Sequence, residues 1–178
     1  MTIRPCVESD RPVLLEIINL AAEAYRGVIP PDRWHEPYMP EEELISEIAA
    51  GVEFVGCEWE GALIGVMGIQ PVRNVRLIRH AYVLPEWQGQ GIGSALIEHL
   101  CQDSDRPILV GTWSAAEWAI GFYRRHGFST APQEEIPALL RTYWSVPDRQ
   151  IETSTVLAAP PLDREGAAKL MAASEVVD

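Results

Sequence analysis

The segment around residues 85–96 constrains the fold most, because an apolar run ends at Leu84-Pro85 and a helical pattern begins after three closely spaced glycines. The segment between them is Gln88-Gly89-Gln90-Gly91-Ile92-Gly93-Ser94. Glycine lets the backbone turn tightly with its N–H groups facing one way, and the helix that follows adds the positive end of its dipole. Such a turn binds phosphate groups. We therefore expect a strand, a phosphate-binding turn and a helix in this order.

The bulk composition is that of a globular domain. The chain has 178 residues, of which 47% are hydrophobic, and no apolar run approaches the roughly 20 residues that span a bilayer. Cys6, Cys57 and Cys101 are odd in number and far apart, which favours buried thiols over a disulfide framework or a metal site. A formal charge of −12 disfavours nucleic acid and anionic membranes as partners. It would attract cationic acceptors, although solubility alone is a sufficient explanation of the charge. The first residues lack a secretory signal, so we expect a cytoplasmic protein.

The spacing of apolar residues predicts an α+β fold, in which a mixed and mostly antiparallel central sheet is flanked by about four helices. The sequence Ser114-Ala115-Ala116-Glu117 has the form of a helix capping box, and Gly127 is expected to end the same helix. Residues 1–158 are expected to form the domain, and residues 159–178 a tail that is partly helical or disordered. The expected strands are 2–4, 52–59, 62–70, 75–84, 108–112, 139–145 and 150–158, with helices near 10–25, 40–51, 91–100 and 114–126.

Two common kinds of phosphate-binding turn fit the glycine segment poorly. A P-loop requires lysine and then serine or threonine after its last glycine, whereas Gly93 is followed by Ser94-Ala95. A dinucleotide-binding turn requires Gly-x-Gly-x-x-Gly and an acidic residue at the end of the next strand. Here the spacing is Gly-x-Gly-x-Gly, and the next predicted strand ends Gly111-Thr112-Trp113. A P-loop is therefore excluded, and a dinucleotide-binding enzyme is a weak alternative.

Residues 82–96 resemble the acetyl-CoA motif of the GNAT superfamily of N-acetyltransferases, Gln/Arg-x-x-Gly-x-Gly/Ala, through Gln88, Gly91 and Gly93. Residues 119–128, Ala-Ile-Gly-Phe-Tyr-Arg-Arg-His-Gly-Phe, resemble the second signature of the family, Phe-Tyr-x-x-x-Gly-Phe. The resemblance implies a GNAT-like acyl-CoA N-acyltransferase fold and an enzyme that moves an acetyl group from acetyl-CoA to a primary amine by direct attack. A non-catalytic acyl-CoA-binding module of the same fold is the alternative.

The resemblance also implies which residues bind coenzyme A. Backbone N–H groups of the glycine segment would hold the pyrophosphate, and the end of the preceding strand would follow the pantetheine arm. The N–H of Val83 is the candidate that stabilises the oxyanion. For Arg124, contact with the 3′-phosphate competes with ordinary surface ion pairing. The implied CoA-binding residues are Tyr82, Val83, Gln88, Gly89, Gln90, Gly91, Ile92, Gly93, Ser94 and Arg124.

Two residues are candidates for the proton transfers. Tyr123 matches the tyrosine that serves as acid toward the leaving thiolate in many members of the family, and its alternative is a packed aromatic. His80 lies on the strand that leads into the glycine segment, and imidazole titrates near neutral pH, as a base toward an ammonium group requires. A structural histidine, with a glutamate or a water molecule as the base, is the alternative.

The resemblance places the acceptor against residues 25–38 and 139–149. Trp34, Tyr38 and Tyr143 are the candidate contacts, because aromatic rings near acidic residues suit a cationic small-molecule or peptide amine. Core packing is the alternative for these rings. Residues 141–150 are also a candidate edge for a homodimer.

Overall fold

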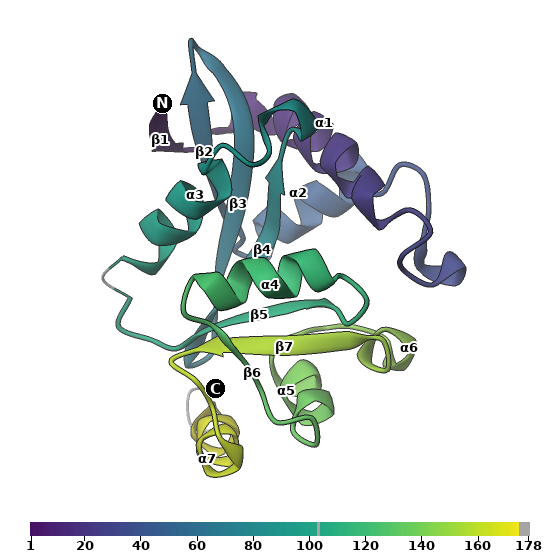
Figure 1. Cartoon of the computed structure of the whole chain (residues 1–178), viewed down its shortest axis with the longest axis vertical. Coiled ribbons are helices and arrows are strands. Elements are labelled where there is room, and N and C mark those ends of the chain that lie inside the picture. The colour runs from purple at the N-terminus through teal and green to yellow at the C-terminus, as the bar shows by residue number, and fades with distance from the viewer. Residues whose placement is uncertain (103, 175–178) are drawn as a thin grey trace. The chain divides into compact units, whose positions relative to one another are not determined.

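The computed structural model describes residues 1–102 and 104–174 (Figure 1). The chain forms two compact units. The first consists of Met1–Gln70 and Ile78–Asp103, and the second of Pro71–Leu77 and Ser104–Asp178. The chain therefore crosses between the units three times, twice near the turn that joins two long strands.

The first unit contains β1 (Thr2–Pro5), β2 (Glu53–Trp59), most of β3 (Ala62–Val72) and the end of β4 (Val75–Val83). Strand β1 pairs antiparallel with β2, and β2 pairs antiparallel with β3. The register shifts between Cys57 and Glu58, where β3 carries an extra residue. The helices are α1 (Arg11–Ala22), α2 (Glu41–Ala49) and α3 (Ile92–Cys101), with short 3₁₀ turns at Glu8–Asp10, Glu23–Tyr25, Pro31–Arg33 and Pro85–Trp87.

Helices α1 and α2 pack on one face of this unit's strands. Leu14, Ile17 and Leu44 form a buried cluster with Phe54 of β2 and Val66 of β3. Side chains of neighbouring strand residues point to opposite faces, so Gly65 belongs to the other face. An added Cβ there would meet Ile92 of α3. Helix α3 therefore covers the face opposite α1 and α2, as Figure 1 shows.

The loop between α1 and α2 is fastened to α1 by one side chain. The Oδ1 of Asn19 accepts a hydrogen bond from the N–H of Met39 (2.8 Å). Its Nδ2 donates to the carbonyl of Met39 (3.0 Å) and to that of Leu15 (2.9 Å). Met39 is buried, so its backbone polar groups need these partners. Asn19 therefore fixes the end of the loop that carries Trp34 and Tyr38.

The three cysteines are free thiols, but the prediction that they are buried holds for Cys57 alone. Only Cys57 is fully buried, while Cys6 and Cys101 are partly exposed. Burial, with a smaller contribution from the charge of Asp10, raises the pKa of Cys6 to about 11. Cys6 is therefore protonated at neutral pH.

The second unit contains the start of β4, β5 (Ile108–Trp113), β7 (Ser154–Ala159) and β6 (Ser129–Thr130). Strand β7 pairs antiparallel with both β5 and β6. The helices are α4 (Glu117–Arg125), α5 (Ile136–Tyr143), α6 (Asp148–Ile151) and α7 (Arg164–Ser174). In order of hydrogen-bonded neighbours, the seven strands are β1-β2-β3-β4-β5-β7-β6. The predicted mixed, mostly antiparallel α+β sheet is confirmed.

Three local predictions in the second unit are wrong. Residues 139–145 were expected as a strand, but they lie largely in helix α5. Residues 150 and 151, the start of the next expected strand (150–158), belong to α6, and β7 begins at Ser154. Ser114 does not cap α4, because the cap residue is Ala116 and it makes no side-chain hydrogen bond. The described residues contain seven α-helices rather than about four. The period that identifies α5 is in the sequence, since its buried residues recur at i, i+3, i+4 and i+7: Ile136, Leu139, Leu140 and Tyr143.

The segment predicted as a tail contains helix α7, and its residues 175–178 lie outside the described residues. Ala167 and Ser174 of α7 are buried, and Leu170 packs against the core of the second unit. The Nδ2 of Asn74 donates to the carbonyl of Leu170 (2.8 Å), which ties α7 to the turn before β4. None of the described helices has the length and apolarity to cross a membrane.

We predict that Asn19→Ala lowers the free energy of unfolding by about 1–3 kcal/mol, because two buried backbone groups of Met39 lose their partners. Urea denaturation followed by circular dichroism measures this loss. The matched control is Leu20→Ala on the same helix, where the side chain is 46% exposed and the change should stay within about 0.5 kcal/mol. Equal losses in the two variants would contradict the role of Asn19.

Candidate functional site

The glycine segment forms the turn that was predicted between β4 and α3. Gly89 has φ +75° and Gly91 has φ +82°, in the left-handed region that side chains disfavour. A Cβ at either position would meet no atom within 4 Å, so backbone conformation rather than crowding requires glycine there. Gly91 is the N-cap residue of α3. The two glycines therefore set the path by which the chain enters the helix.

The backbone donors of this turn are available to a ligand. The N–H of Gln88 donates to the carbonyl of Pro85 (3.3 Å), and the N–H of Ala95 donates to that of Gly91 (3.0 Å). Between these two bonds, no backbone N–H of residues 89–94 has an acceptor within the described part of the chain. The first N–H groups of a helix have no carbonyl partner within it, and they lie at the positive end of the helix dipole. The residues present therefore fit a bound phosphate or pyrophosphate.

Side chains of the turn fasten it to the end of β4. The Nε2 of Gln88 donates to the carbonyl of Val83 (3.1 Å), and the Nε2 of Gln90 donates to the carbonyl of Glu86 (3.1 Å). The N–H of Leu84 donates to the carbonyl of Ile64 on β3 (3.0 Å). Val83, the predicted oxyanion donor, is therefore held directly beside the turn.

Gly65 of β3 allows α3 to come close to the end of β4. Sequence analysis did not identify Gly65 as important. A Cβ at Gly65 would lie 2.9 Å from Cγ2 of Ile92, 3.2 Å from Cγ2 of Val83 and 3.4 Å from the carbonyl oxygen of Tyr82. Ile92 is the first residue of α3 and is buried. A glycine inside a strand is the available sequence signal for such a close approach.

His80, the predicted base, lies in β4 and pairs with a glutamate from α2. Its Nε2 makes a short contact with Oε2 of Glu47, and the other oxygen of Glu47 lies 2.7 Å from Nη2 of Arg79. The Nη1 of Arg79 donates to Oε1 of Gln70 (2.7 Å). The ring of Phe54 stacks against His80 with centroids 5.9 Å apart. Sequence analysis missed Glu47, Arg79 and Gln70, because nothing in the sequence pairs α2 with β4.

The electrostatics of this cluster keep Glu47 ionised. Burial by itself raises the pKa of the Glu47 carboxyl, but the hydrogen bond and charge of His80 and the charge of Arg79 outweigh burial. The net effect is a pKa below the ordinary value. Glu47 is therefore a carboxylate near neutral pH.

The structure brings Trp34 and Tyr38 together with a residue of the predicted CoA strand. The Trp34 and Tyr38 rings lie 5.5 Å apart, and Tyr38 stacks on Tyr25 at 6.0 Å. Tyr25 meets Tyr82 of β4 edge to face at 6.5 Å. A continuous row of rings thus runs from the loop to the strand that ends beside the glycine turn. We call these four rings (Tyr25, Trp34, Tyr38 and Tyr82) the aromatic row.

One face of Trp34 is already covered by a cation of the same chain. The guanidinium of Arg26 lies 4.6 Å from the Trp34 ring centroid. It also pairs with Glu23 (2.7 Å) and Glu36 (2.6 Å), and all three side chains are largely exposed. This loop therefore binds a guanidinium group with an aromatic face and two carboxylates.

Tyr123, the predicted acid, lies in the second unit near the end of α4. Its side chain is buried, and its ring meets Phe122 at 5.2 Å and Phe128 at 5.8 Å. The N–H of Phe128 donates to the carbonyl of Tyr123 (3.1 Å), and the N–H of Gly127 to that of Arg124 (3.3 Å). These two bonds, with Gly127 at φ +84°, form the Schellman motif that was predicted to end the helix. The second signature therefore builds a helix end around Tyr123.

Arg124 and Tyr143 also have partners within the second unit. The Nη2 of Arg124 donates to Oγ1 of Thr130 (2.8 Å), although Arg124 itself is exposed. Tyr143 is buried, and its hydroxyl lies 3.0 Å from Oδ1 of Asn74 and 3.1 Å from the carbonyl oxygen of Leu170. Tyr143 thus fastens α7 to the core of the second unit. This packing role replaces the contact with the acceptor that was predicted for Tyr143.

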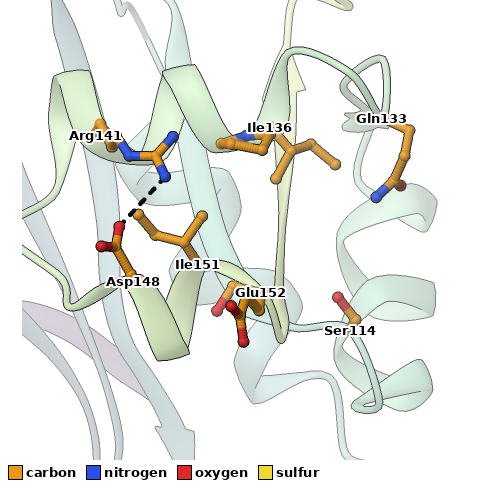
Figure 2. Close-up of a pocket in the computed structure, with 9 residues that line it drawn as sticks. Ser114, Gln133, Ile136, Arg141, Asp148, Ile151 and Glu152 are labelled. Atoms are coloured by element: carbon orange, nitrogen blue, oxygen red, sulfur yellow. Dashed lines mark hydrogen bonds and ion pairs between the residues drawn. The ribbon is translucent and has the colours of Figure 1, made fainter.

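A cavity of about 450 Å³ opens in the second unit beside α5 and α6. Figure 2 shows Arg141 and Asp148 at one side and Gln133 and Ser114 at the other, with Glu152 between them. The Nη2 of Arg141 lies 3.3 Å from Oδ1 of Asp148. Two of its lining residues, Arg141 and Asp148, lie in the range 139–149 that was predicted for the acceptor. The full lining is Ser114, Gln133, Ile136, Pro137, Arg141, Asp148, Ile151, Glu152 and Ser154.

Comparison with known protein families supports this interpretation of the turn. Residues 50–130, somewhat less than half of the chain, match the model of the acetyltransferase (GNAT) domain. This match covers the glycine turn and both signatures. Residues 50–130 therefore resemble the GNAT acetyltransferase domain, and the fold agrees with that of solved GNAT acetyltransferases. Comparison with curated protein sequences found no match.

Solved structures of several acetyltransferases share the fold. PaiA N-acetyltransferase from Thermoplasma acidophilum, in complex with coenzyme A, matches with a TM-score of 0.64 and 18% identity, over 89% of this chain and 98% of that chain. The ribosomal-protein-S18-alanine N-acetyltransferase of Escherichia coli matches with 0.62 and 20%, over 88% and 91%. N-acetylglutamate synthase of Neisseria gonorrhoeae, with coenzyme A and N-acetyl-glutamate, matches with 0.63 and 22%, over 88% of this chain and 34% of that chain.

We predict that Gly91→Ala weakens the binding of coenzyme A about tenfold, because a Cβ in the left-handed region costs about 1–2 kcal/mol and turns the neighbouring N–H groups away. Titration calorimetry measures the affinity. Gly61→Ala is the matched control, since Gly61 also has a positive φ (+84°) and open space but lies in the β2–β3 turn. Equal affinities of Gly91→Ala and the unchanged protein would contradict the role of the turn.

Proposed function

We propose that the protein is an acetyl-CoA-dependent N-acetyltransferase that moves the acetyl group from the thioester to a primary amine by direct attack. The observation that carries the proposal is the turn of residues 89–94, whose N–H groups have no acceptor in the described part of the chain and meet at the start of α3. The match of residues 50–130 to the acetyltransferase (GNAT) domain supports coenzyme A as the ligand that carries the phosphate.

Direct transfer needs a neutral amine, a stabilised oxyanion and a protonated leaving thiolate. In the proposed scheme, His80 takes a proton from the amine and the N–H of Val83 donates to the oxyanion. Tyr123 gives its proton to the thiolate. A C–N bond forms, the C–S bond breaks, and the products are an amide and coenzyme A with a free thiol. His80 and Val83 lie three residues apart on β4, and the role of Tyr123 rests on its sequence motif.

The acceptor is proposed to be a cationic small-molecule or peptide amine. The aromatic row and the carboxylates of Glu23 and Glu36 support this class, because the same loop already holds the guanidinium of Arg26. The cavity beside α5 and α6 also presents Asp148 and Glu152. Two of the solved structures compared above are named for different acceptors, the alanine of a ribosomal protein and glutamate.

Titration calorimetry with acetyl-CoA and with NAD separates the proposal from a dinucleotide-binding enzyme. We expect acetyl-CoA to bind and NAD not to bind. Binding of NAD without binding of acetyl-CoA would overturn the proposal. Release of free thiol from acetyl-CoA across a panel of aminoglycosides, polyamines, amino acids and peptide N-termini then separates an enzyme from a non-catalytic acyl-CoA-binding module. We expect release with at least one of these amines.

We predict that Tyr123→Phe lowers kcat by about tenfold or more while the affinity for acetyl-CoA changes little, because only the proton donor is removed. Steady-state thiol release and calorimetry measure the two quantities. Tyr143→Phe removes the same atom from another buried tyrosine, and it should lower stability by about 1 kcal/mol without changing kcat. An unchanged kcat in Tyr123→Phe would remove Tyr123 from the mechanism.

A further inference from the structure

Glu47 contacts His80 in addition to its ion pair with Arg79, which by itself would join α2 to β4. Arg79 already joins α2 to the sheet, since it binds Oε1 of Glu47 and Oε1 of Gln70, both at 2.7 Å. His80 occupies the remaining oxygen of the same carboxylate. The exposed fractions of the His80 and Glu47 side chains are 13% and 18%. The cluster therefore contains a nearly buried titratable ring in addition to its ion pair.

The backbone and its neighbours hold the His80 ring in place. His80 has φ +49°, which is an uncommon conformation for a residue with a side chain and interrupts the regular strand. Phe54 stacks against the ring from β2. Gly68 makes room for Phe54, because a Cβ at Gly68 would come within 3.3 Å of the Phe54 ring and 3.0 Å of the carbonyl oxygen of Arg79. Such local strain is maintained where surrounding contacts determine one geometry.

The ionised carboxylate also decides which ring nitrogen carries hydrogen. A carboxylate only accepts hydrogen bonds, so the Nε2 of His80 must be the donor toward Oε2 of Glu47. In the neutral ring, Nδ1 is then the nitrogen with a free lone pair. Nδ1 is therefore the atom of His80 that can accept a proton.

We propose that Glu47 is a positioning residue for His80: it fixes the tautomer with hydrogen on Nε2 and stabilises the imidazolium that forms when Nδ1 takes a proton from the acceptor amine. The proposal rests on the proposed function, because it needs His80 as the base. In this step the amine lone pair forms the bond to the thioester carbon and the amine proton moves to Nδ1. Glu47 stays ionised throughout.

The charged groups around His80 act in opposite directions. Glu47 from α2 favours the imidazolium, and Arg79, its neighbour on β4, opposes it. The other groups that form the cluster, Gln70 of β3 and Phe54 of β2, carry no charge. Removing one charge or the other should therefore move the protonation of the base in opposite directions. If the pair is purely structural and His80 is not the base, neither variant moves the acidic limb of the activity profile.

The test is the pH profile of kcat/KM for Glu47→Gln and Arg79→Gln, with the amine that gives the fastest thiol release. We expect the midpoint of the acidic limb to move to lower pH in Glu47→Gln and to higher pH in Arg79→Gln. We also expect kcat of Glu47→Gln to fall about tenfold. Shifts in the same direction, or none, would overturn the proposal. If Glu47→Gln does not fold, the tautomer of His80 in the unchanged protein decides.

NMR of ¹⁵N-labelled histidine in the protein without acceptor separates this inference from the proposed function. The His80 signals, assigned with His80→Gln, should show hydrogen on Nε2 in the neutral ring. Hydrogen on Nδ1 would overturn the positioning role even in an active enzyme. A different result is also informative: His80 carries hydrogen on Nε2, but the protein releases no thiol with any amine. That result would overturn the proposed function and, with it, the role of His80 as the base.

Discussion

The close packing of α3 against the end of the β3–β4 pair governs the geometry of the first unit. It is possible because position 65 has no side chain, so the first residue of α3 comes within van der Waals contact of the strand. The N-terminal end of the helix is thereby held at a fixed distance from the last residues of β4. The turn between them must close that short gap, and left-handed glycines at 89 and 91 allow it to do so. The position of the donors in this turn thus depends on one missing Cβ.

The charge of the chain makes these local donors necessary. A protein with a formal charge of −12 offers an anionic ligand an unfavourable overall field. Backbone N–H groups and a helix dipole act within a few ångströms, where the distant carboxylates are largely screened. On the other face of the sheet, Glu47 acts at the same short range on His80. The acidic composition is therefore compatible with an anionic donor substrate and favours a cationic acceptor.

Local signals in the sequence predicted local structure well. The glycine turn and the end of α4 depend on residues within about six positions of one another, and both are confirmed in conformation. Helix α5 was mistaken for a strand because Thr142, Tyr143 and Trp144 favour strands, although its apolar period is helical. The contact between Glu47 and His80 joins residues 33 positions apart and needs the packing of α2 on β4 to exist. No sequence pattern encodes that packing. The helix dipole explains Glu41, Glu42 and Glu43 in the first turn of α2, but not Glu47 near its C-terminal end.

Arg26 has a consequence for any free cation that binds the face of Trp34. The guanidinium is tethered to the same loop, so it competes as an intramolecular ligand with an effective concentration in the millimolar range or above. A free amine must displace it and then satisfy Glu23 and Glu36 in its place. Weakly bound monoamines would lose this competition, whereas a polycation with several charges would replace each contact of Arg26 at once. In the proposed acceptor site, Arg26 would therefore select ligands by their charge rather than by their shape.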